Sequence, residues 1–197
     1  MFVQIIEGKT KDPEAIQALG ERWERELQPG ATGYLGVTSG TAADGRAITI
    51  VRFDSPESAR LNSERPEQTA FFNEMSALFD GPPSFAESTD TEAFLGGISP
   101  SAQFVQVMKT AGADRVRTKG LDDQLEKFAT LRPDLLGIFR VWTAGDTSYE
   151  VAYFTNEAAA RAGESQELPD EMAAVMAEYA DVMRNTEFLD LVNPRIS

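Results

Sequence analysis

An internal repeat is the feature that most constrains the fold of this chain. Three segments of the first half return in the same order in the second half, with an offset of 102 residues for the first segment and 101 for the other two. Self-similarity at a fixed spacing indicates one structural module that occurs twice. The matching segments are FVQI at 2–5 with FVQV at 104–107, YLGV at 34–37 with LLGI at 135–138, and FDSPESAR at 53–60 with FTNEAAAR at 154–161.

The joint between the two copies is predicted where the sequence GGISPSA interrupts both hydrophobic patterns. Gly, Ser and Pro in such a cluster are typical of a linker. A chain of 197 residues is also long enough for two small domains. The predicted organisation is therefore a first repeat at 1–95, a linker at 96–102 and a second repeat at 103–197.

The first copy predicts the element order β-α-β-β-α-β. Runs rich in Val, Ile and Phe predict strands, and apolar residues three and four apart predict helices. Asp12 before Pro13 predicts the start of the first helix, and Asp44 before Gly45 predicts a hairpin turn. The expected elements are a strand at 2–7, a helix that begins at 13 and stops near 29, strands at 33–39 and 46–53, a helical turn at 56–62, a helix that begins at 66 and a strand at 85–90.

The second copy predicts the same order, so each half is a ferredoxin-like unit of the α+β class. Its expected elements are a strand at 103–109, a helix with Leu121, Leu125 and Phe128, a hairpin of 135–142 and 147–154, a helix with Met172, Val175, Met176 and Tyr179, and a strand near 182–188. A sheet with helices on one face leaves its other face to be covered, and a second copy can cover it.

The element order and the third strands carry a family resemblance. In both halves the third strand ends in an aromatic residue, and a polar segment with ESAR or AAAR follows. This pattern resembles the dimeric α/β-barrel superfamily, in particular the antibiotic-biosynthesis-monooxygenase-like domains, and the resemblance covers both halves. Members usually build the barrel from two chains. The resemblance implies that this tandem chain forms one pseudo-twofold barrel by itself, with a ligand cavity on the inner side of each sheet.

Strand alternation predicts which side chains share a face of each sheet. In the third strands, one face carries a uniformly bulky set, and we expect this face to pack against the helices. The mixed set on the other face is then expected to look into the barrel. The bulky set is Ile48, Ile50, Tyr149 and Val151, and the mixed set is Thr49, Val51, Phe53, Glu150, Ala152 and Phe154.

Candidate ligand-binding residues follow from polar or aromatic side chains at matching positions of the two copies. Gln4 and Gln106 lie between apolar neighbours of the first strands, where an amide suits a cavity better than an apolar core. Tyr34 and Trp142 lie on or beside the second strands and would add aromatic surface. The alternative is that the amides only form hydrogen bonds across the sheet, and that the aromatic residues pack in a core or an interface.

The resemblance also gives a test for catalysis. The cofactor-free monooxygenases of the group use an Asn and a Trp, four residues apart on the third strand, to position an aromatic substrate. This sequence has Thr49 and Phe53 at those positions in the first copy, and Glu150 and Phe154 in the second. Neither pair matches. Haem-dependent relatives rely on a histidine ligand, and this chain has no histidine. No cofactor is therefore predicted, and whether the chain is an enzyme stays open.

Glu150 is the candidate catalytic residue. A carboxylate within an apolar strand is costly unless it is paired, and partial burial raises the pKa of a carboxyl toward the range of a general base. Arg184, near the last strand of the same half, is the expected partner. The alternative is that Glu150 faces solvent at an open edge or only forms an ion pair.

Composition excludes several other classes of site. Without cysteine or histidine the chain has no disulfide, no Cys/His zinc site and no Ser-His-Asp triad. A net charge of −14 disfavours nucleic acid and anionic lipid surfaces. No apolar run approaches the roughly 20 residues of a membrane span, and residues 1–7 lack the basic region of a secretory signal. The expectation is a cytoplasmic protein, a monomer or a homodimer of the tandem chain.

The predicted function is binding of a small apolar or aromatic molecule between sheet and helices, by a binding protein or by a cofactor-independent oxygenase-like or isomerase-like enzyme. The alternative is a non-catalytic structural or interaction protein whose barrel is filled by its own phenylalanines. Because Thr49 and Glu150 differ, we expect at most one half to keep a working site, the second. Besides Glu150, the candidate site residues are Gln4, Tyr34, Thr49, Phe53, Gln106, Trp142, Phe154 and Arg184.

Overall fold

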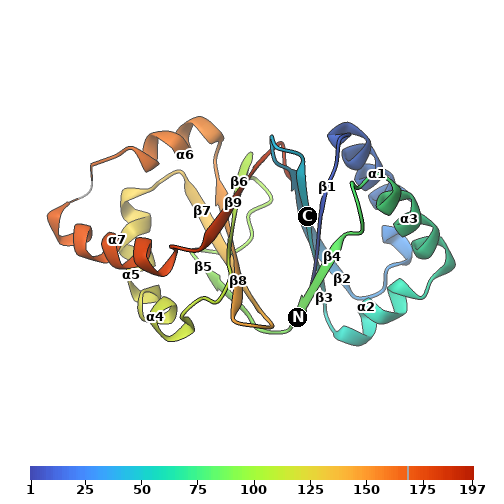
Figure 1. Cartoon of the computed structure of the whole chain (residues 1–197), viewed down its shortest axis with the longest axis horizontal. Helices are drawn as coiled ribbons and strands as arrows, with labels where there is room; N and C mark the ends of the chain where they lie inside the picture. The colour runs from blue at the N-terminus through green and yellow to red at the C-terminus, as the bar shows by residue number, and fades with distance from the viewer. Residues whose placement is uncertain (168) are drawn as a thin grey trace. The chain divides into compact units, whose positions relative to one another are not determined.

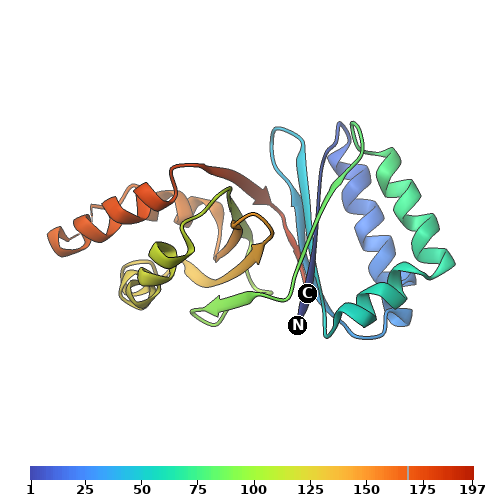
Figure 2. The ribbon, with the colours of Figure 1, turned by 60° about the horizontal axis from the view of Figure 1, so that its bottom comes forward.

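The computed structural model describes residues 1–167 and 169–197 (Figure 1). The chain divides into two compact units. The first unit consists of Met1–Thr89 and Pro194–Ser197, and the second consists of Asp90–Asn193. Each unit contains one five-stranded antiparallel sheet with helices on one of its faces (Figures 1 and 2). The α+β class and the two ferredoxin-like repeats in one chain are confirmed.

In the first unit, every predicted element is present within a few residues of its expected position. The sheet has the strand order β10-β2-β3-β1-β4. The elements are β1 (Phe2–Lys9), α1 (Pro13–Glu26), a short 3-10 turn (Gln28–Gly30), β2 (Tyr34–Thr41), β3 (Arg46–Phe53), α2 (Pro56–Ser63), α3 (Pro66–Ala77), β4 (Ser84–Ser88) and, from the end of the chain, β10 (Arg195–Ile196).

The second unit has the corresponding strand order β5-β7-β8-β6-β9. Its last long strand begins at Thr186, after the residue 182 at which we expected it, because the helix before it continues to Val182. Its first helical segment is split in two at Gly120 and Leu121. The elements are β5 (Thr91–Phe94), β6 (Phe104–Thr110), α4 (Arg115–Gly120), α5 (Asp122–Leu131), β7 (Leu135–Thr143), β8 (Thr147–Phe154), α6 (Glu157–Glu164), α7 (Asp170–Val182) and β9 (Thr186–Val192).

The repeat is visible in local backbone signals as well as in element order. The side chains of Ser55 and Asn156, 101 residues apart, cap the equivalent helices α2 and α6 by accepting from a backbone N–H three residues later. The pairing of β2 with β3 and that of β7 with β8 each shift register, just before Gly36 and just before Gly137. The duplication therefore extends to helix capping and strand register.

Two short strands were not predicted from the sequence. The strand β5 follows the last strand of the first repeat and pairs with β7, whereas β10 follows the last strand of the second repeat and pairs with β2. Each sheet thus takes its fifth strand from the chain that follows the other repeat. The predicted joint at 96–102 lies between β5 and β6, and the domain boundaries at 95 and 103 stay a prediction.

The alternation of side chains in the third strands is correct, but the expected orientation of the two faces is wrong. In the second unit, Ala152 and Phe154 pack with Ala160 of the helix α6. In the first unit, Phe53 packs with Ala59 of α2. The mixed set therefore faces the helices. The size of the strand side chains did not predict which face packs against the helices. The helices contribute large side chains to this packing, so small residues on the sheet fit against them.

The described part of the chain contains no helix that is long and apolar enough to cross a membrane.

Candidate functional site

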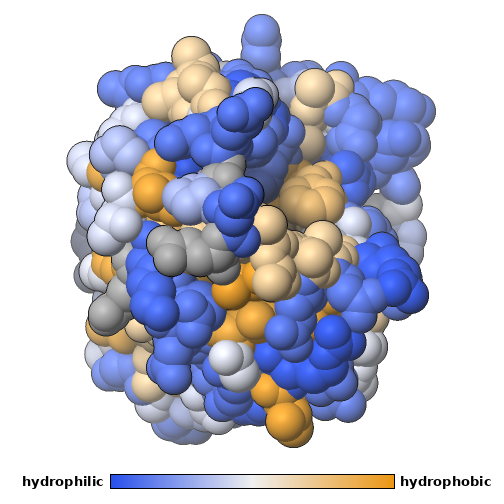
Figure 3. Space-filling model, turned by 90° about the vertical axis from the view of Figure 1, so that its left-hand side faces the viewer, coloured by the Kyte–Doolittle hydropathy of each residue, from blue (hydrophilic) through white to orange (hydrophobic). Residues whose placement is uncertain are grey.

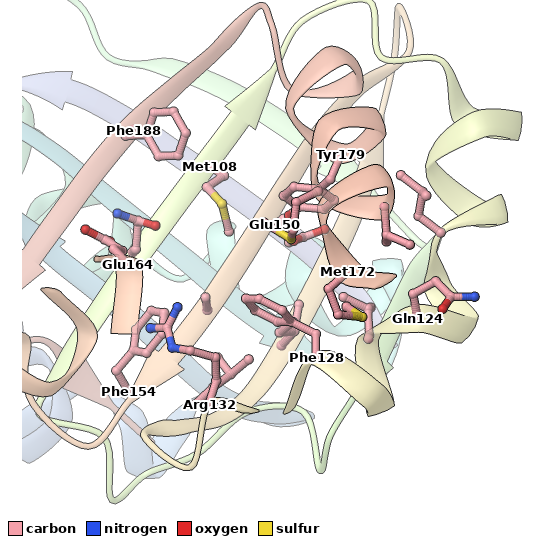
Figure 4. A pocket seen from close by; sticks show the side chains of 18 of the residues that line it. Met108, Gln124, Phe128, Arg132, Glu150, Phe154, Glu164, Met172, Tyr179 and Phe188 are labelled. Atoms are coloured by element: carbon pink, nitrogen blue, oxygen red, sulfur yellow. The ribbon is translucent and has the colours of Figure 1, made fainter. Parts of the chain in front are cut away.

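A cavity of about 460 Å³ lies between the sheet and the helices of the second unit. Its volume is within the usual range for a site that holds a small molecule. The strands β6, β7, β8 and β9 supply one wall, and the helices α5, α6 and α7 supply the other (Figure 4). In the view of the side that carries these helices, hydrophilic side chains surround a central area of apolar surface (Figure 3).

Most of the cavity lining is apolar, with methionine and phenylalanine from both walls. Polar groups lie among them at separate places. The apolar residues are Met108, Leu121, Leu125, Phe128, Leu135, Ile138, Ala152, Phe154, Met172, Val175, Met176 and Phe188; the polar ones are Gln106, Gln124, Arg132, Glu150, Arg161, Glu164, Tyr179 and Asp190.

Glu150 is held at the cavity wall by a buried ion-pair network centred on Arg140. The two residues are direct cross-strand neighbours in the pairing of β7 with β8. Arg140 donates to Glu150 Oε2 through Nε at 2.9 Å and approaches the same oxygen through Nη2 at 2.8 Å. The Tyr179 hydroxyl donates to the other oxygen, Oε1, at 2.7 Å. Both carboxylate oxygens of Glu150 therefore already have donors.

Arg140 also contacts two further carboxylates, and its side chain is only 1% exposed. Its Nη1 lies 2.8 Å from Asp122 Oδ1 and donates to Glu92 Oε2 at 3.2 Å. Lys119 is 2.7 Å from Glu92 Oε1, and the Trp142 indole donates to Oε2 at 2.8 Å. Two cations, Arg140 and Lys119, thus face three carboxylates. The network depends on Arg140 because Arg140 contacts all three of them.

The network shifts several pKa values in directions that burial and charge explain. Burial opposes ionisation of Arg140, but Glu150 and Asp122 outweigh it, so the pKa of Arg140 is raised. Burial raises the pKa of Asp122, and Arg140 offsets only part of the rise. Burial also acts on Glu92, yet hydrogen bonds from Lys119, Trp142 and Arg140 hold its pKa below the ordinary value. Burial and the charge of Glu150 raise the pKa of Tyr179 well above 10.0.

A second polar group lies on β6, β9 and α6. The Gln106 amide donates to Asp190 Oδ1 at 2.9 Å. Arg161 forms an ion pair with the other oxygen of Asp190, and its Nη1 donates to Glu164 at 3.1 Å. The first unit has the same cross-strand pair, since Gln4 donates to Glu87 at 2.8 Å. The amides therefore bond across the sheet in both units, and in the second unit the pair also borders the cavity.

Three predicted site residues line the cavity, namely Glu150, Gln106 and Phe154. Trp142 lies beside the network through its bond to Glu92. Arg184, the expected partner of Glu150, is largely exposed and pairs with Asp181 instead; it is not among the described residues of the lining. The partner that the sequence analysis missed is Arg140, which the hairpin register places opposite Glu150.

The remaining predicted residues, Gln4, Tyr34, Thr49 and Phe53, belong to the first unit. There an apolar cluster lies between the sheet and the helices. The Tyr34 ring lies 5.0 Å from the Trp23 ring and 6.0 Å from the Phe53 ring. Trp23 and Phe71 belong to one apolar cluster with Leu19 and Leu27. These predicted residues are therefore core or sheet residues of the first unit.

Among the residues that the structure describes, no group of three or more acidic side chains is arranged to hold a metal ion. The cavity itself offers apolar surface, amides, a tyrosine hydroxyl and guanidinium groups. Such a lining can bind a mostly apolar molecule and orient it through a few hydrogen bonds.

The two repeats, each with a five-stranded sheet and helices on one face of it, define a tandem ferredoxin-like protein. Over its whole length the chain is similar to a protein assigned as a monooxygenase from Lactobacillus acidophilus, with a TM-score of 0.72, 12% identity and coverage of 100% of this chain and 95% of that one. It is also similar to an anthrone oxidase-like protein, with a TM-score of 0.71, 13% identity and coverage of 99% and 92%.

The same architecture occurs in a protein with a different role. A major regulator of staphylococcal pathogenesis matches with a TM-score of 0.51, 10% identity and coverage of 98% of this chain and 99% of that one. At these identities the likeness establishes a shared fold. No family model and no curated protein sequence matches the chain.

Proposed function

We propose that the second unit binds a small, mostly apolar or aromatic molecule in the cavity between its sheet and its helices. The observation that carries the proposal is the 460 Å³ cavity itself, since a domain of this size normally fills such a space with side chains. In the first unit, Trp23, Phe71 and Tyr34 pack together in the equivalent space. The proposed site therefore lies in the second unit.

The proposal concerns binding, and Glu150 has a positioning role in it. Both oxygens of Glu150 are occupied by Arg140 and Tyr179, so this carboxylate is not a free base. It fixes the Tyr179 hydroxyl at the cavity wall, where the hydroxyl oxygen is able to accept a hydrogen bond from a ligand. An oxygenase-like or isomerase-like reaction would then depend on the bound molecule and on Tyr179 rather than on proton transfer to Glu150.

A fluorescence titration with N-phenyl-1-naphthylamine, an apolar dye that brightens in apolar surroundings, tests the proposal. We expect one bound dye per chain. In Ala152→Phe the added ring occupies the cavity from the sheet side, and binding should be lost. Thr49→Ala, at the position of the first unit that corresponds to Glu150, is the matched control and should bind as the original chain does.

The melting temperature of each variant shows whether it is folded. If Ala152→Phe does not fold, Met176→Trp narrows the same cavity from α7 and replaces it. Absence of dye binding to the original chain, or equal loss in Thr49→Ala and Ala152→Phe, would contradict the proposal and favour the structural or interaction protein. Three-ring aromatic compounds are the next compounds to titrate, because one solved protein with this fold is anthrone oxidase-like.

A further inference from the structure

We propose that Arg132 recognises an anionic oxygen of the ligand, so that the molecule bound by the second unit has an apolar ring body and an acidic group at one end. This inference rests on the proposed function, because it assigns the polar end of the same ligand. It is carried by the bonding of the Arg132 guanidinium, because one of its nitrogens has no partner among the residues that the structure describes.

The Arg132 side chain is 6% exposed and is fixed on two of its nitrogens. Its Nε donates to Asp134 Oδ1 at 3.0 Å and its Nη2 donates to Asp134 Oδ2 at 2.8 Å. Nη2 also donates to the Ala160 carbonyl at 3.2 Å. The third nitrogen, Nη1, has no hydrogen-bond partner among the described residues, although a guanidinium nitrogen of this kind carries two N–H donors.

Two observations support access to Nη1 from the cavity. Arg132 belongs to the lining, and Nη1 is not among the polar atoms that are sealed in the interior without a partner. The rings of Phe128 and Phe154 lie 5.8 and 5.4 Å from the Arg132 Cζ and cover the guanidinium (Figure 4). An aromatic environment and a fixed guanidinium favour a strong, directional bond to an incoming oxygen.

The other arginines near the cavity are already bonded to several acceptors. Arg140 contacts Glu150, Asp122 and Glu92. Arg161 pairs with Asp190, Glu164 and Glu157. Arg140 and Arg161 thus each contact three carboxylates, whereas Arg132 contacts the carboxylate of Asp134. Arg132 has the capacity to accept a further anion without losing Asp134.

The backbone around Arg132 is adapted to its position. A Cβ atom at Gly163 on α6 would overlap the Arg132 guanidinium, so a glycine is needed there for this side chain to reach the Ala160 carbonyl. At the equivalent positions of the first unit, 101 residues earlier, the sequence has Ala31 and Asn62. Ala31 is a buried member of the apolar cluster. The arginine and the glycine that admits it thus occur together in the unit that has the cavity.

The test compares two dyes that share one ring body. The first is N-phenyl-1-naphthylamine, which is neutral, and the second is 8-anilinonaphthalene-1-sulfonate, which adds an anionic sulfonate. We expect the original chain to bind the sulfonate dye more tightly. In Arg132→Met/Asp134→Asn, where neither a cation nor an unpaired carboxylate is left, affinity for the sulfonate dye should fall by about 10- to 100-fold. Affinity for the neutral dye should change less than about threefold.

Two single variants serve as controls in the same titrations. Asp134→Asn keeps Arg132 and removes a competing carboxylate, so affinity for the sulfonate dye should stay the same or rise. Arg161→Met removes the other lining arginine and should leave the preference between the dyes unchanged. A purely structural role of Arg132 would change both affinities together.

The outcomes separate this inference from the proposed function. If the neutral dye binds but the sulfonate dye has no advantage, or keeps its advantage in Arg132→Met/Asp134→Asn, the role of Arg132 is wrong and the cavity remains a binding site. If Arg161→Met alone removes the advantage, the anion is held by Arg161. If neither dye binds the original chain, the proposed function fails and the inference fails with it.

Discussion

The two units of this protein share a backbone design but use the space between sheet and helices differently. Both have corresponding strand orders, a side-chain cap on the helix α2 or α6, and a glutamine that bonds to a carboxylate on the edge strand β4 or β9. In the first unit that space contains a packed aromatic cluster. In the second it contains a cavity and a buried ion network. The comparison shows that one arrangement of sheet and helices supports either a packed apolar cluster or a cavity.

Side-chain size at equivalent positions explains the difference. Tyr34 of the first unit corresponds to Leu135 of the second, and Val51 corresponds to Ala152. The smaller residue is in the second unit in both cases, and both of these residues line its cavity. Each missing group removes volume that the surrounding helices do not replace. The cavity therefore accompanies smaller side chains at these two positions within the same fold.

The largest expected effect concerns charge. At the positions of Arg140 and Glu150 the first unit has Ser39 and Thr49. Arg140→Ser copies the first unit at one position and leaves Glu150 and Asp122 buried without their cation, so the free energy of unfolding should fall by about 3–5 kcal/mol. Urea unfolding of the original chain and of Arg140→Ser at neutral pH measures this loss of stability.

The double variant Arg140→Ser/Glu150→Thr copies both residues of the first unit and is the matched control. Because it also removes one of the stranded carboxylates, it should be more stable than Arg140→Ser alone. A double variant that is no more stable than the single one would show that the loss comes from packing rather than from the unpaired charge.

A smaller loss of stability is expected when a large side chain is removed from the apolar cluster of the first unit. Phe71 is buried in the aromatic cluster, and Phe71→Ala should lower the free energy of unfolding by about 3 kcal/mol. Met172 lines the cavity of the second unit, so it already borders open space on one side. Met172→Ala should therefore cost about 2 kcal/mol, at the low end for a buried methionine. Equal losses in chemical unfolding would mean that the two spaces are packed alike.

The fold was largely predictable because its signals are local and occur twice. Apolar periodicity predicted the long strands and helices, and both copies gave the same element order. What the sequence did not reveal were β5 and β10. These short strands have no alternating pattern of their own, and their existence depends on a partner strand far away in the sequence. The predicted orientation of the third strands was wrong because both faces of each strand are rich in apolar residues.

The site was predictable only where strand geometry fixes it. Alternation predicted that Glu150 and Phe154 share a face, and both line the cavity with Gln106, although that face was expected to look away from the helices. Arg140 could have been found as well, since a hairpin whose turn is centred at residue 145 places residue 140 opposite residue 150. The role proposed for Arg132 could not be predicted from the sequence, because it depends on Gly163 and on the helix α6, which approach Arg132 only in the folded chain.

The smallest expected effect compares two tyrosines through the pH dependence of stability. Burial raises the pKa of Tyr34 in the first unit and raises the pKa of Tyr179 well above 10.0 in the second, where the charge of Glu150 adds to it. A raised pKa means that the folded chain keeps its proton at a pH where the unfolded chain has lost it. Stability is therefore complete below pH 10 and falls as pH rises above it.

For Tyr179 the expected slope of the unfolding free energy is on the order of 1 kcal/mol per pH unit. Urea unfolding between about pH 9 and pH 11 measures this slope in the original chain, in Tyr179→Phe and in Tyr34→Phe. Tyr179→Phe should flatten it most, although the variant is less stable at every pH because Glu150 loses a donor. If Tyr34→Phe flattens the slope as much, the buried charge of the second unit does not set the difference between the two tyrosines.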